Sequence, residues 1–488
     1  MIFEESIEVI DMLIKKYKEM SIELKATLWF TFCLAVQKGV AVITTPVFTR
    51  LMSTQQYGQY SVFNSWLQIF SIITTLKLTG AVFNKGMSKY KNDRDAYTST
   101  MQTVTLLITI IITGIYLIFR KYINELTGLP TIIMLAMFLE LMVDPAVNFW
   151  TLRKRYEYQY KVVVIRTVSY VVLNAIIGII VVAMSEEKGY ARILSSVVVS
   201  FCFGLMLFVA NLANGKKILK KEYAVFAITF NTPLLLHYFS QYVLDQFDRI
   251  MIQKMDSVSA AGKYSVAYSA GALLMIITQG INSSLVPWQY KKLEEKKFKS
   301  LDDVLYQTYL IILGTVMLFS AFAPEVMKVL AGPKYYQAVY VVPPVALGML
   351  FLHMYTSVAN IEFYYSLNKF TMYISMVGAA LNVVLNYIFI KMFGYVAAAY
   401  TTLVCYIIFA FSHYIYVSVN VKKIEKIDKM MDSKRIVILS AISVLYCIGI
   451  SLVYDNTIAR IVIIAAISVI IFIKRETVLG TFKTMKKR

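Results

Sequence analysis

The sequence predicts an all-α polytopic membrane protein with about fourteen transmembrane helices, arranged as two six-helix lobes related by a parallel repeat plus two C-terminal helices. Hydrophobic residues make up 58% of the 488 residues and charged residues only 16%, whereas soluble domains carry about 25% charged residues. The apolar residues also form runs of roughly 20, the length that a helix needs to cross about 30 Å of hydrocarbon.

The apolar runs define the order of the predicted elements. They begin near Thr27, Gly58, Tyr97, Pro130, Val162, Ala191, Ala224, Ser259, Val304, Gln337, Phe370, Gly394, Arg435 and Thr457. The parts that we predict are an amphipathic cytoplasmic segment (1–25), an N-lobe with helices 1–6 (26–215), a C-lobe with helices 7–12 (216–421), and helices 13 and 14 with a basic cytoplasmic tail (422–488). The apolar stripe of the first segment consists of Ile7, Ile10, Leu13 and Ile14.

The basic residues predict the orientation. Most of the 49 Lys and Arg residues fall in segments on the same side as the N-terminus when the runs alternate across a bilayer, which places both termini in the cytoplasm. The clusters 215–221 (GKKILKK) and 291–297 (KKLEEKK) are then topology signals beside anionic lipid. Because they lack interleaved stacking aromatics, the net charge of +20 does not predict nucleic acid as a partner.

Two short words recur along the chain. Residues 58–62 (GQYSV) return as 262–266 (GKYSV), and the words 189–191 (GYA) and 394–396 (GYV) follow at nearly the same spacing. Shared words at a shared spacing indicate a duplication. Six helices per copy is an even number, so both copies enter the membrane in the same sense, and we expect a site between the halves.

The joint between the first two runs, residues 44–62 (TTPVFTRLMSTQQYGQYSV), carries three notable residues. Pro46 is expected to loosen or bend the outer end of helix 1. Arg50 is expected to bury its stem and hydrate its head at the interface. Gly58 is expected to permit the turn that leads into helix 2.

These residues also carry a resemblance. Residues 44–62 resemble the first helix and loop of Wzx-type flippases, the polysaccharide-transporter branch of the multidrug/oligosaccharidyl-lipid/polysaccharide (MOP) exporter superfamily. Residues 244–271 (LDQFDRIMIQKMDSVSAAGKYSVAYSAG) resemble the seventh-helix region of that family.

The resemblance implies a flippase that moves polyprenyl-diphosphate-linked oligosaccharide repeat units from the cytoplasmic to the outer leaflet by alternating access. The product would be a surface polysaccharide such as O-antigen lipopolysaccharide, capsule or exopolysaccharide. The implied location is the bacterial cytoplasmic (inner) membrane. Membrane lipids, a polysaccharide polymerase and chain-length proteins are the implied partners.

Motifs for catalysis, cofactors and metals are absent from the sequence. There is no G-x-x-x-x-G-K-[S/T] word and no H-E-x-x-H or C-x-x-C word. The cysteines read as buried core thiols, and they are Cys33, Cys202, Cys405 and Cys447. No outer loop is long enough for a catalytic domain, so we expect a protein that is not an enzyme and needs no cofactor or metal.

Polar groups inside transmembrane helices are functional hypotheses. Helix 7 carries four of them at helical spacing on one face, and they are His237, Gln241, Asp245 and Asp248. Arg249 lies one turn beyond Asp245, so an internal ion pair between them is the structural alternative. Gln37 of helix 1 corresponds to Gln241 in the repeat.

Helix 4 carries Glu140, Asp144 and Asn148 at steps of four, and the counter-charges could be Lys38 and Lys77. These four charges could equally form a structural lock. Glu362, near the cytoplasmic end of helix 10, is expected to snorkel, as is Lys369.

We therefore predict two sets of site residues. The substrate-binding set offers cations for a diphosphate and polar groups for the cavity: Lys38, Lys77, Arg249, Gln37, Gln241 and His237. The ion-coupling set is led by Asp144 and Asp245 and also includes Glu140 and Asp248.

Two other functions remain open. The first is a cation-coupled multidrug or small-molecule exporter, either of the same superfamily or of the major-facilitator fold. Against the latter, the predicted second loop, residues 83–97 (FNKGMSKYKNDRDAY), lacks the G-x-x-x-D-R-x-G-R pattern that the major-facilitator fold carries there. The second is a polymerase or ligase acting on the same lipid, which the short outer loops disfavour.

Overall fold

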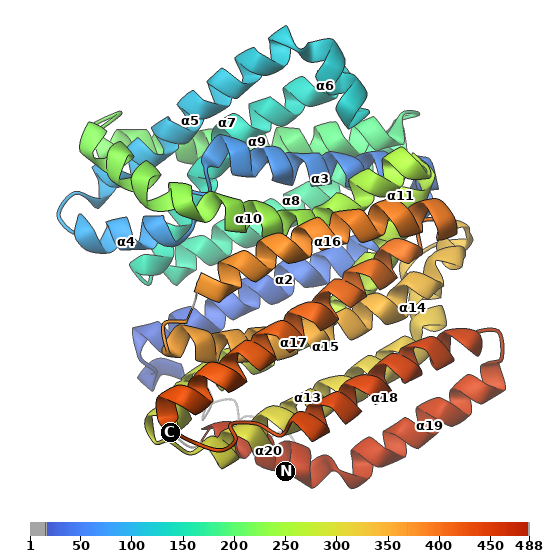
Figure 1. Ribbon diagram of the computed structural model, residues 1–488. Coiled ribbons are helices and arrows are strands. Elements are labelled where there is room, and N and C mark those ends of the chain that lie inside the picture. Colours follow the sequence, from blue (N-terminus) through green and yellow to red (C-terminus); the bar gives the residue numbers. More distant parts are fainter. Residues whose placement is uncertain (1–14, 16, 368, 487–488) are drawn as a thin grey trace, which may run out of the picture. The chain divides into compact units, whose positions relative to one another are not determined.

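The computed structural model describes residues 15, 17–367 and 369–486. This described part is helical and contains no β-strand, and Figure 1 shows the helices in chain order. The predicted all-α class is confirmed. The stripe of Ile7, Ile10, Leu13 and Ile14 lies outside the described residues.

The chain divides into two compact units. Unit 1 contains the described residues up to Thr44 together with Trp66–Leu235, and unit 2 contains Thr45–Ser65 and the described residues from Leu236 onward. The lobe boundaries at 26–215 and 216–421 remain a prediction.

Long helices separated by short turns make up unit 1. Its helices are α2 (Ile22–Leu51) up to the boundary, α3 (Thr54–Thr75) beyond it, α4 (Ala81–Lys89), α5 (Arg94–Ile118), α6 (Arg120–Thr127), α7 (Thr131–Tyr156), α8 (Tyr160–Met184), α9 (Lys188–Gly215) and the first part of α10 (Lys221–Met255). The second loop predicted at residues 83–97 is partly wrong, because residues 83–89 belong to the helix α4.

Unit 2 begins with the joined ends of α2 and α3 and continues with the second part of α10. Its further helices are α11 (Val258–Gly271), η1 (Ala272–Leu274), α12 (Met275–Glu294), α13 (Phe298–Ala321), α14 (Ala323–Leu330), η2 (Pro333–Val341), α15 (Val342–Tyr364), α16 (Lys369–Phe393), α17 (Ala397–Glu425), α18 (Ser433–Leu452), α19 (Thr457–Ile473) and α20 (Arg475–Lys486).

Each of the fourteen predicted apolar runs falls on a helix, with α11, η1 and α12 together forming the eighth. Among the described residues, eleven helices are long and apolar enough to cross a membrane, or twelve if α19 and α20, bent by 53°, count as one span. Two helices outside this set, α3 and α10, are rich in polar residues along their length. The count of fourteen is therefore approximate, because hydropathy alone does not identify every span.

Aromatic residues form the core of unit 1 near α4. Tyr97 is fully buried and donates from its hydroxyl to the Val82 carbonyl at 3.1 Å. A Cβ on Gly86 would lie 2.1 Å from the Tyr97 ring, so only glycine permits this contact. From α10, Tyr223 and Ala227 join the same cluster. One face of the first turns of α10 therefore packs into the core of unit 1.

Two helices outside the repeat are attached to unit 2 by polar contacts. The Tyr446 hydroxyl of α18 donates to the Met317 carbonyl at 2.7 Å. The buried Arg460 of α19 forms two hydrogen bonds, of 2.7 and 2.8 Å, with the Glu325 carboxylate. This bidentate geometry fixes orientation as well as distance, so α18 and α19 form an integral part of unit 2.

The proline near the C-terminal end of α2 does not end the helix. Helix α2 continues through Pro46 to Leu51. Arg50 donates from its guanidinium to the Pro46 carbonyl at 2.9 Å and to the Val329 carbonyl at 3.3 Å. The expected loosening at Pro46 is therefore not seen as a break in the helix.

Candidate functional site

The repeated glycines meet in unit 2. A Cβ on Gly58 of α3 would lie 1.9 Å from the Val258 carbonyl oxygen, and a Cβ on Gly262 of α11 would lie 2.2 Å from the Thr54 carbonyl oxygen. The Thr54 and Ser259 hydroxyls are 2.7 Å apart. The prediction that Gly58 makes a turn is wrong: Gly58 lies inside α3, and glycine is needed there because the two helix backbones touch.

A buried polar cluster surrounds Asp248 of α10. Its carboxylate is fully buried and accepts hydrogen bonds from the Tyr264 hydroxyl at 2.7 Å, the Asn386 amide at 2.8 Å and the Thr402 hydroxyl at 3.0 Å. Asn382 donates to Thr402 at 3.1 Å. Four helices thus converge on one carboxylate: α10, α11, α16 and α17.

The oxygen atoms around Asp248 match the ligands of hard cations. Carboxylate, amide and hydroxyl oxygens bind such cations, and side-chain amides and hydroxyls can present either a donor or an acceptor. Within the described residues, no group of three or more His, Cys, Asp or Glu side chains is placed to hold a metal ion.

Asp245 and Arg249 contact each other through the backbone. Arg249 donates from its guanidinium to the Asp245 main-chain carbonyl at 2.6 Å, and lies 4.5 Å from the centre of the Tyr268 ring. The side chain of Asp245 is exposed, and its carboxylate accepts a 3.5 Å hydrogen bond from the Tyr406 hydroxyl. The structural alternative predicted an ion pair between the two side chains. The structure instead shows the Arg249 guanidinium bonded to the Asp245 main-chain carbonyl.

The other two residues predicted on helix 7 differ in exposure. Gln241 is exposed, whereas His237 is half-buried and its Nδ1 atom has no hydrogen-bond partner among the described residues. Gln241 and Asp245 thus lie on the exposed side of α10, and Asp248 faces the interior. The helical spacing predicted that Asp248 shares one face with the other three residues, but in the structure it is buried while Gln241 and Asp245 are exposed.

The acidic residues of α7 lie in unit 1. Glu140 is buried, and its Oε2 atom has no hydrogen-bond partner in the described part of the chain. Asp144 accepts a 3.1 Å hydrogen bond from Asn148. Two cations lie close enough to act on Asp144, and they are Arg166 of α8 and Lys77. The sequence analysis missed Arg166, because nothing in the sequence of α8 alone indicates that this side chain approaches α7.

Three of the predicted polar residues in unit 1 are placed as follows. Gln37 and Lys38 are exposed on α2. Lys77 lies in the turn after α3 with a φ of +52°, so its predicted position inside a helix is wrong. Lys38 and Lys77 therefore differ in setting: one is on a helix surface, and the other is in a turn that is close enough to act on Asp144.

A second buried polar cluster was missed. The Glu362 carboxylate of α15 is fully buried, lies 2.5 Å from His413 Nδ1 of α17 and accepts a 2.7 Å hydrogen bond from Thr371 of α16. The prediction that Glu362 snorkels is wrong, because His413 and Thr371 supply partners in the interior. The separation of these residues in sequence left no local signal.

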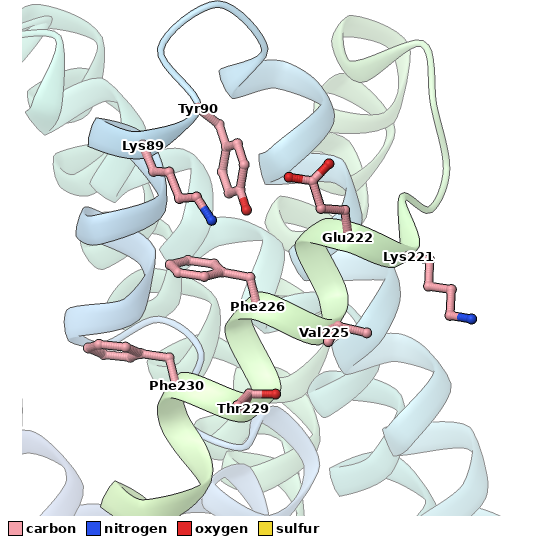
Figure 2. Close-up of a pocket in the computed structure, with 8 residues that line it drawn as sticks. All are labelled: Lys89, Tyr90, Lys221, Glu222, Val225, Phe226, Thr229 and Phe230. Atoms are coloured by element: carbon pink, nitrogen blue, oxygen red, sulfur yellow. The ribbon is translucent and has the colours of Figure 1, made fainter.

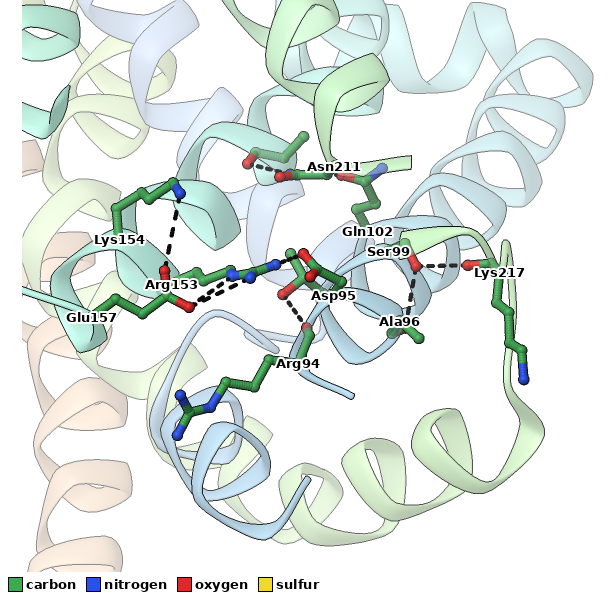
Figure 3. Close-up of polar contacts among 12 residues, drawn as sticks. Arg94, Asp95, Ala96, Ser99, Gln102, Arg153, Lys154, Glu157, Asn211 and Lys217 are labelled. Atoms are coloured by element: carbon green, nitrogen blue, oxygen red, sulfur yellow. Dashed lines mark hydrogen bonds and ion pairs between the residues drawn. The ribbon is translucent and has the colours of Figure 1, made fainter. Parts of the chain in front are cut away.

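Ion pairs gather at one end of unit 1, shown in Figure 3. The Arg153 guanidinium pairs with Asp95 and, at 3.3 Å, with Glu157. Nearby, Lys220 pairs with Asp93, which also accepts a 2.7 Å hydrogen bond from Tyr223. The Lys220 ammonium, followed by the Tyr223 hydroxyl, lowers the pKa of Asp93. Some residues of the basic clusters thus have acidic partners within the protein.

Side-chain amides hold three helices together near the same end of unit 1. Asn211 of α9 donates to Gln102 of α5 at 2.9 Å and to the Ala146 carbonyl of α7 at 3.1 Å (Figure 3). Ser99 donates to the Lys217 carbonyl at 2.6 Å. These contacts satisfy buried polar groups and fix the ends of the helices that carry Arg153 and Asp95.

The cysteines differ in exposure. Cys33, Cys405 and Cys447 are buried, as predicted, but Cys202 is exposed on α9. The prediction of a core thiol at Cys202 is wrong, because its side chain is exposed.

Comparisons with known proteins bear on the family. A family model described as "Polysaccharide biosynthesis protein" matches residues 24–292, and one described as MatE matches residues 233–388. The "Lsg locus putative protein 1" of Haemophilus influenzae is 24% identical over 338 residues, which cover 68% of this chain and 82% of that protein. The "Probable low-salt glycan biosynthesis flippase Agl15" of Haloferax volcanii is 21% identical over 386 residues, which cover 78% and 80%.

Solved structures share the fold at low sequence identity. The lipid II flippase MurJ, in an inward closed conformation, aligns with a TM-score of 0.71 at 12% identity, over 92% of this chain and 100% of that one. An inward-facing multidrug resistance MATE family transporter of the MOP superfamily aligns with a TM-score of 0.59 at 12% identity, over 81% and 99%. Because the match at residues 24–292 spans more than half of the sequence, the chain belongs to the polysaccharide biosynthesis protein family, within the MOP exporter superfamily that its sequence resembles.

Proposed function

We propose that this transporter is a flippase for polyprenyl-diphosphate-linked oligosaccharide repeat units, which it moves from the cytoplasmic to the outer leaflet by alternating access. Family membership supports a role in polysaccharide biosynthesis. The fold of the lipid II flippase covers more of this chain than the MATE structures do, 92% against 81–84%. This difference favours the lipid-linked substrate over a drug.

The contact between Gly58 and Gly262 is the observation that supports alternating access. It joins the two copies of the sequence repeat through backbone atoms and through the hydroxyls of Thr54 and Ser259. The two helices can separate at this contact without exposing an unpaired charge. Hydroxyls and carbonyls exchange protein partners for water at little net cost in free energy. An alternating transporter needs a contact of this kind at one end.

We also propose that Asp248 is the main ion-coupling residue. Of the predicted set Asp144, Asp245, Asp248 and Glu140, it accepts hydrogen bonds from the largest number of side chains, namely Tyr264, Asn386 and Thr402. Glu140, with an unpaired oxygen, is the second candidate. The proposed substrate-binding residues remain Lys38, Lys77, Gln37, Gln241, His237 and Arg249.

The proposed location is the cytoplasmic membrane with both termini inside. Lys217, Lys296 and Lys426 should then lie in the cytoplasm, and each lies in or beside a turn between helices. Gln56 and Ala260 should lie outside. Reporter fusions at these positions test the orientation, and a cytoplasmic Gln56 would reverse it.

A reversible cross-link tests the proposed function. Cysteines in place of Thr54 and Ser259 would bring their sulfur atoms within disulfide range, and Cys202→Ser removes the exposed native thiol. Expressed in a strain that lacks the gene, the double-cysteine variant should accumulate lipid-linked repeat units when oxidised and export them after reduction. Each single-cysteine variant should export under both conditions.

The phenotype of the strain that lacks the gene separates the flippase, the multidrug exporter and the polymerase. Accumulated lipid-linked repeat units in the cytoplasmic leaflet indicate the flippase. Sensitivity to drugs, without such accumulation, would instead indicate a multidrug exporter. Single units that reach the outer face without being polymerised would indicate a polymerase.

A further inference from the structure

A groove runs along the first turns of α10 in unit 1. It has a volume of about 680 Å³, and α4 with its following residue Tyr90 forms the opposite wall. Figure 2 shows Lys89, Tyr90 and Phe226 directed toward the same space. The groove lies at the edge of the core that contains Tyr223 and Ala227, because Tyr90, Phe226 and Phe230 line the groove and also pack against that core.

The floor of the groove is aromatic and its rim is basic. The Lys89 ammonium lies 4.5 Å from the centre of the Phe226 ring, and the Lys85 ammonium lies 4.5 Å from the centre of the Phe230 ring. Ring faces attract cations, so both ammonium groups are held directly over the apolar floor. A ligand in this groove would meet positive charge and hydrocarbon side by side.

One polar group in the groove lacks a partner. The Tyr90 hydroxyl is buried, and no described residue forms a hydrogen bond with it. Its ring lies 5.0 Å from the Lys89 ammonium. A buried hydroxyl without a partner costs free energy, and an anionic oxygen placed between the hydroxyl and the Lys89 ammonium would satisfy both.

We propose that this groove binds an anionic phospholipid. The phosphate would lie between the Lys89 ammonium and the Tyr90 hydroxyl, and an acyl chain would follow Phe226 and Phe230. Glu222 is the one acidic residue among the described residues that line the groove, and nearby Asp93 is already paired with Lys220. The local charge is therefore positive and suits a lipid phosphate.

The predicted topology agrees with this occupant. The positive-inside pattern predicts that the start of α10 lies at the cytoplasmic surface, where anionic lipids are attracted to basic side chains. The apolar run of helix 7 begins near Ala224, so Phe226 and Phe230 would lie at acyl-chain depth. A water-soluble peptide or free phosphate would leave these rings uncovered.

Thermal unfolding of the full-length protein tests the proposal. Purified protein in detergent would be supplemented with dioleoyl phosphatidylglycerol or, for comparison, with dioleoyl phosphatidylcholine. We expect phosphatidylglycerol to raise the unfolding midpoint relative to phosphatidylcholine. In a Lys85→Gln/Lys89→Gln variant this difference should fall by at least half, and Tyr90→Phe should reduce it by a smaller amount.

A matched control is the Lys299→Gln/Lys483→Gln variant, which removes two exposed lysines of unit 2 and should keep the full difference. Each variant is compared with itself in phosphatidylcholine, so a general loss of stability does not mimic the result. An unchanged difference in the Lys85→Gln/Lys89→Gln variant would overturn the proposal. A larger shift with farnesyl diphosphate, lost in the same variant, would overturn the phospholipid assignment and identify an isoprenoid diphosphate as the ligand.

Discussion

Gly58 and Gly262 contact each other across α3 and α11, and each lies against a carbonyl of the other helix. The two contacts are reciprocal, because Gly58 meets Val258 and Gly262 meets Thr54, four residues before the partner glycine in each case. A duplicated sequence folded into two similar copies can form such a contact about a local two-fold axis, as identical surfaces do in symmetric dimers.

The first prediction concerns this contact. Gly58→Ala or Gly262→Ala should force α3 and α11 apart, because the added methyl group would overlap a backbone carbonyl. In the Thr54→Cys/Ser259→Cys background, either change should sharply lower the yield of oxidative cross-linking. Gly39→Ala is the control: no atom lies within 4 Å of its added methyl group, and alanine favours a helix by about 0.5–1 kcal/mol. Equal cross-linking in all three variants would show that the helices do not touch in the membrane.

The sequence could reveal the repeat but not the role of its glycines. A glycine in a turn and a glycine in a close helix contact look the same in one sequence. The helical class and the fourteen runs followed from hydrophobicity, which acts locally. The network around Asp248 could not be predicted, because Asn386 and Thr402 approach it only through the packing of α16 and α17 on α10.

The second prediction concerns the contact between Glu362 and His413. Leaving a buried hydrogen-bonding group without its partner costs about 1–3 kcal/mol, so Glu362→Ala, which deprives both His413 and Thr371 of theirs, should lower the free energy of unfolding by this order for each group. Glu362→Gln should cost less, because the amide can still bond to Thr371. Glu294→Ala, at an exposed position of α12, should have almost no effect. Equilibrium unfolding in a denaturing detergent provides the measurement.

A double-mutant cycle shows whether Glu362 and His413 act together. If the 2.5 Å contact is formed, Glu362→Gln combined with His413→Gln should cost less than the sum of the two single changes, by about 1 kcal/mol or more. Additive effects would mean that the two side chains do not interact.

The third prediction concerns pH. Lys292, followed by Lys297, lowers the pKa of Glu295 to about 2, below the ordinary value of about 4.3 for glutamate. A depressed folded-state pKa contributes stability that is present above the unfolded-state pKa and is lost as the pH falls through the folded-state value. The difference in unfolding midpoint between the native protein and Glu295→Gln should therefore stay constant above pH 5 and shrink between about pH 4 and 2. A difference that changes near pH 7 would contradict this assignment.

The fourth prediction separates two neighbouring acids of α10. Asp245 is exposed, and Arg249 contacts its backbone carbonyl, so Asp245→Asn should leave protein level and stability nearly unchanged. If Asp245 contributes to transport, this well-folded variant should still accumulate lipid-linked repeat units in the cytoplasmic leaflet. Normal export would remove Asp245 from the coupling set without affecting the proposal for Asp248.

Asp248→Asn tests the ion-coupling proposal most directly. Three donors reach the native carboxylate, from Tyr264, Asn386 and Thr402. An asparagine has one acceptor oxygen and adds an NH₂ group, so one donor would lose its partner at a cost of about 1–3 kcal/mol. This cost alone would lower the unfolding midpoint, and therefore stability does not distinguish a structural role from a coupling role.

The response to cations makes that distinction. A cation that binds the folded protein raises its unfolding midpoint in proportion to the logarithm of the cation concentration. If Asp248 holds sodium, adding sodium chloride should raise the native midpoint more than choline chloride does at equal ionic strength, and Asp248→Asn should abolish this difference. If Asp248 instead carries a proton, neither salt should differ, and export by the native protein should depend on a pH gradient that Asp248→Asn no longer uses. A sodium-specific shift that persists in Asp248→Asn would place the cation elsewhere, and Glu140→Gln would then be the next variant to measure.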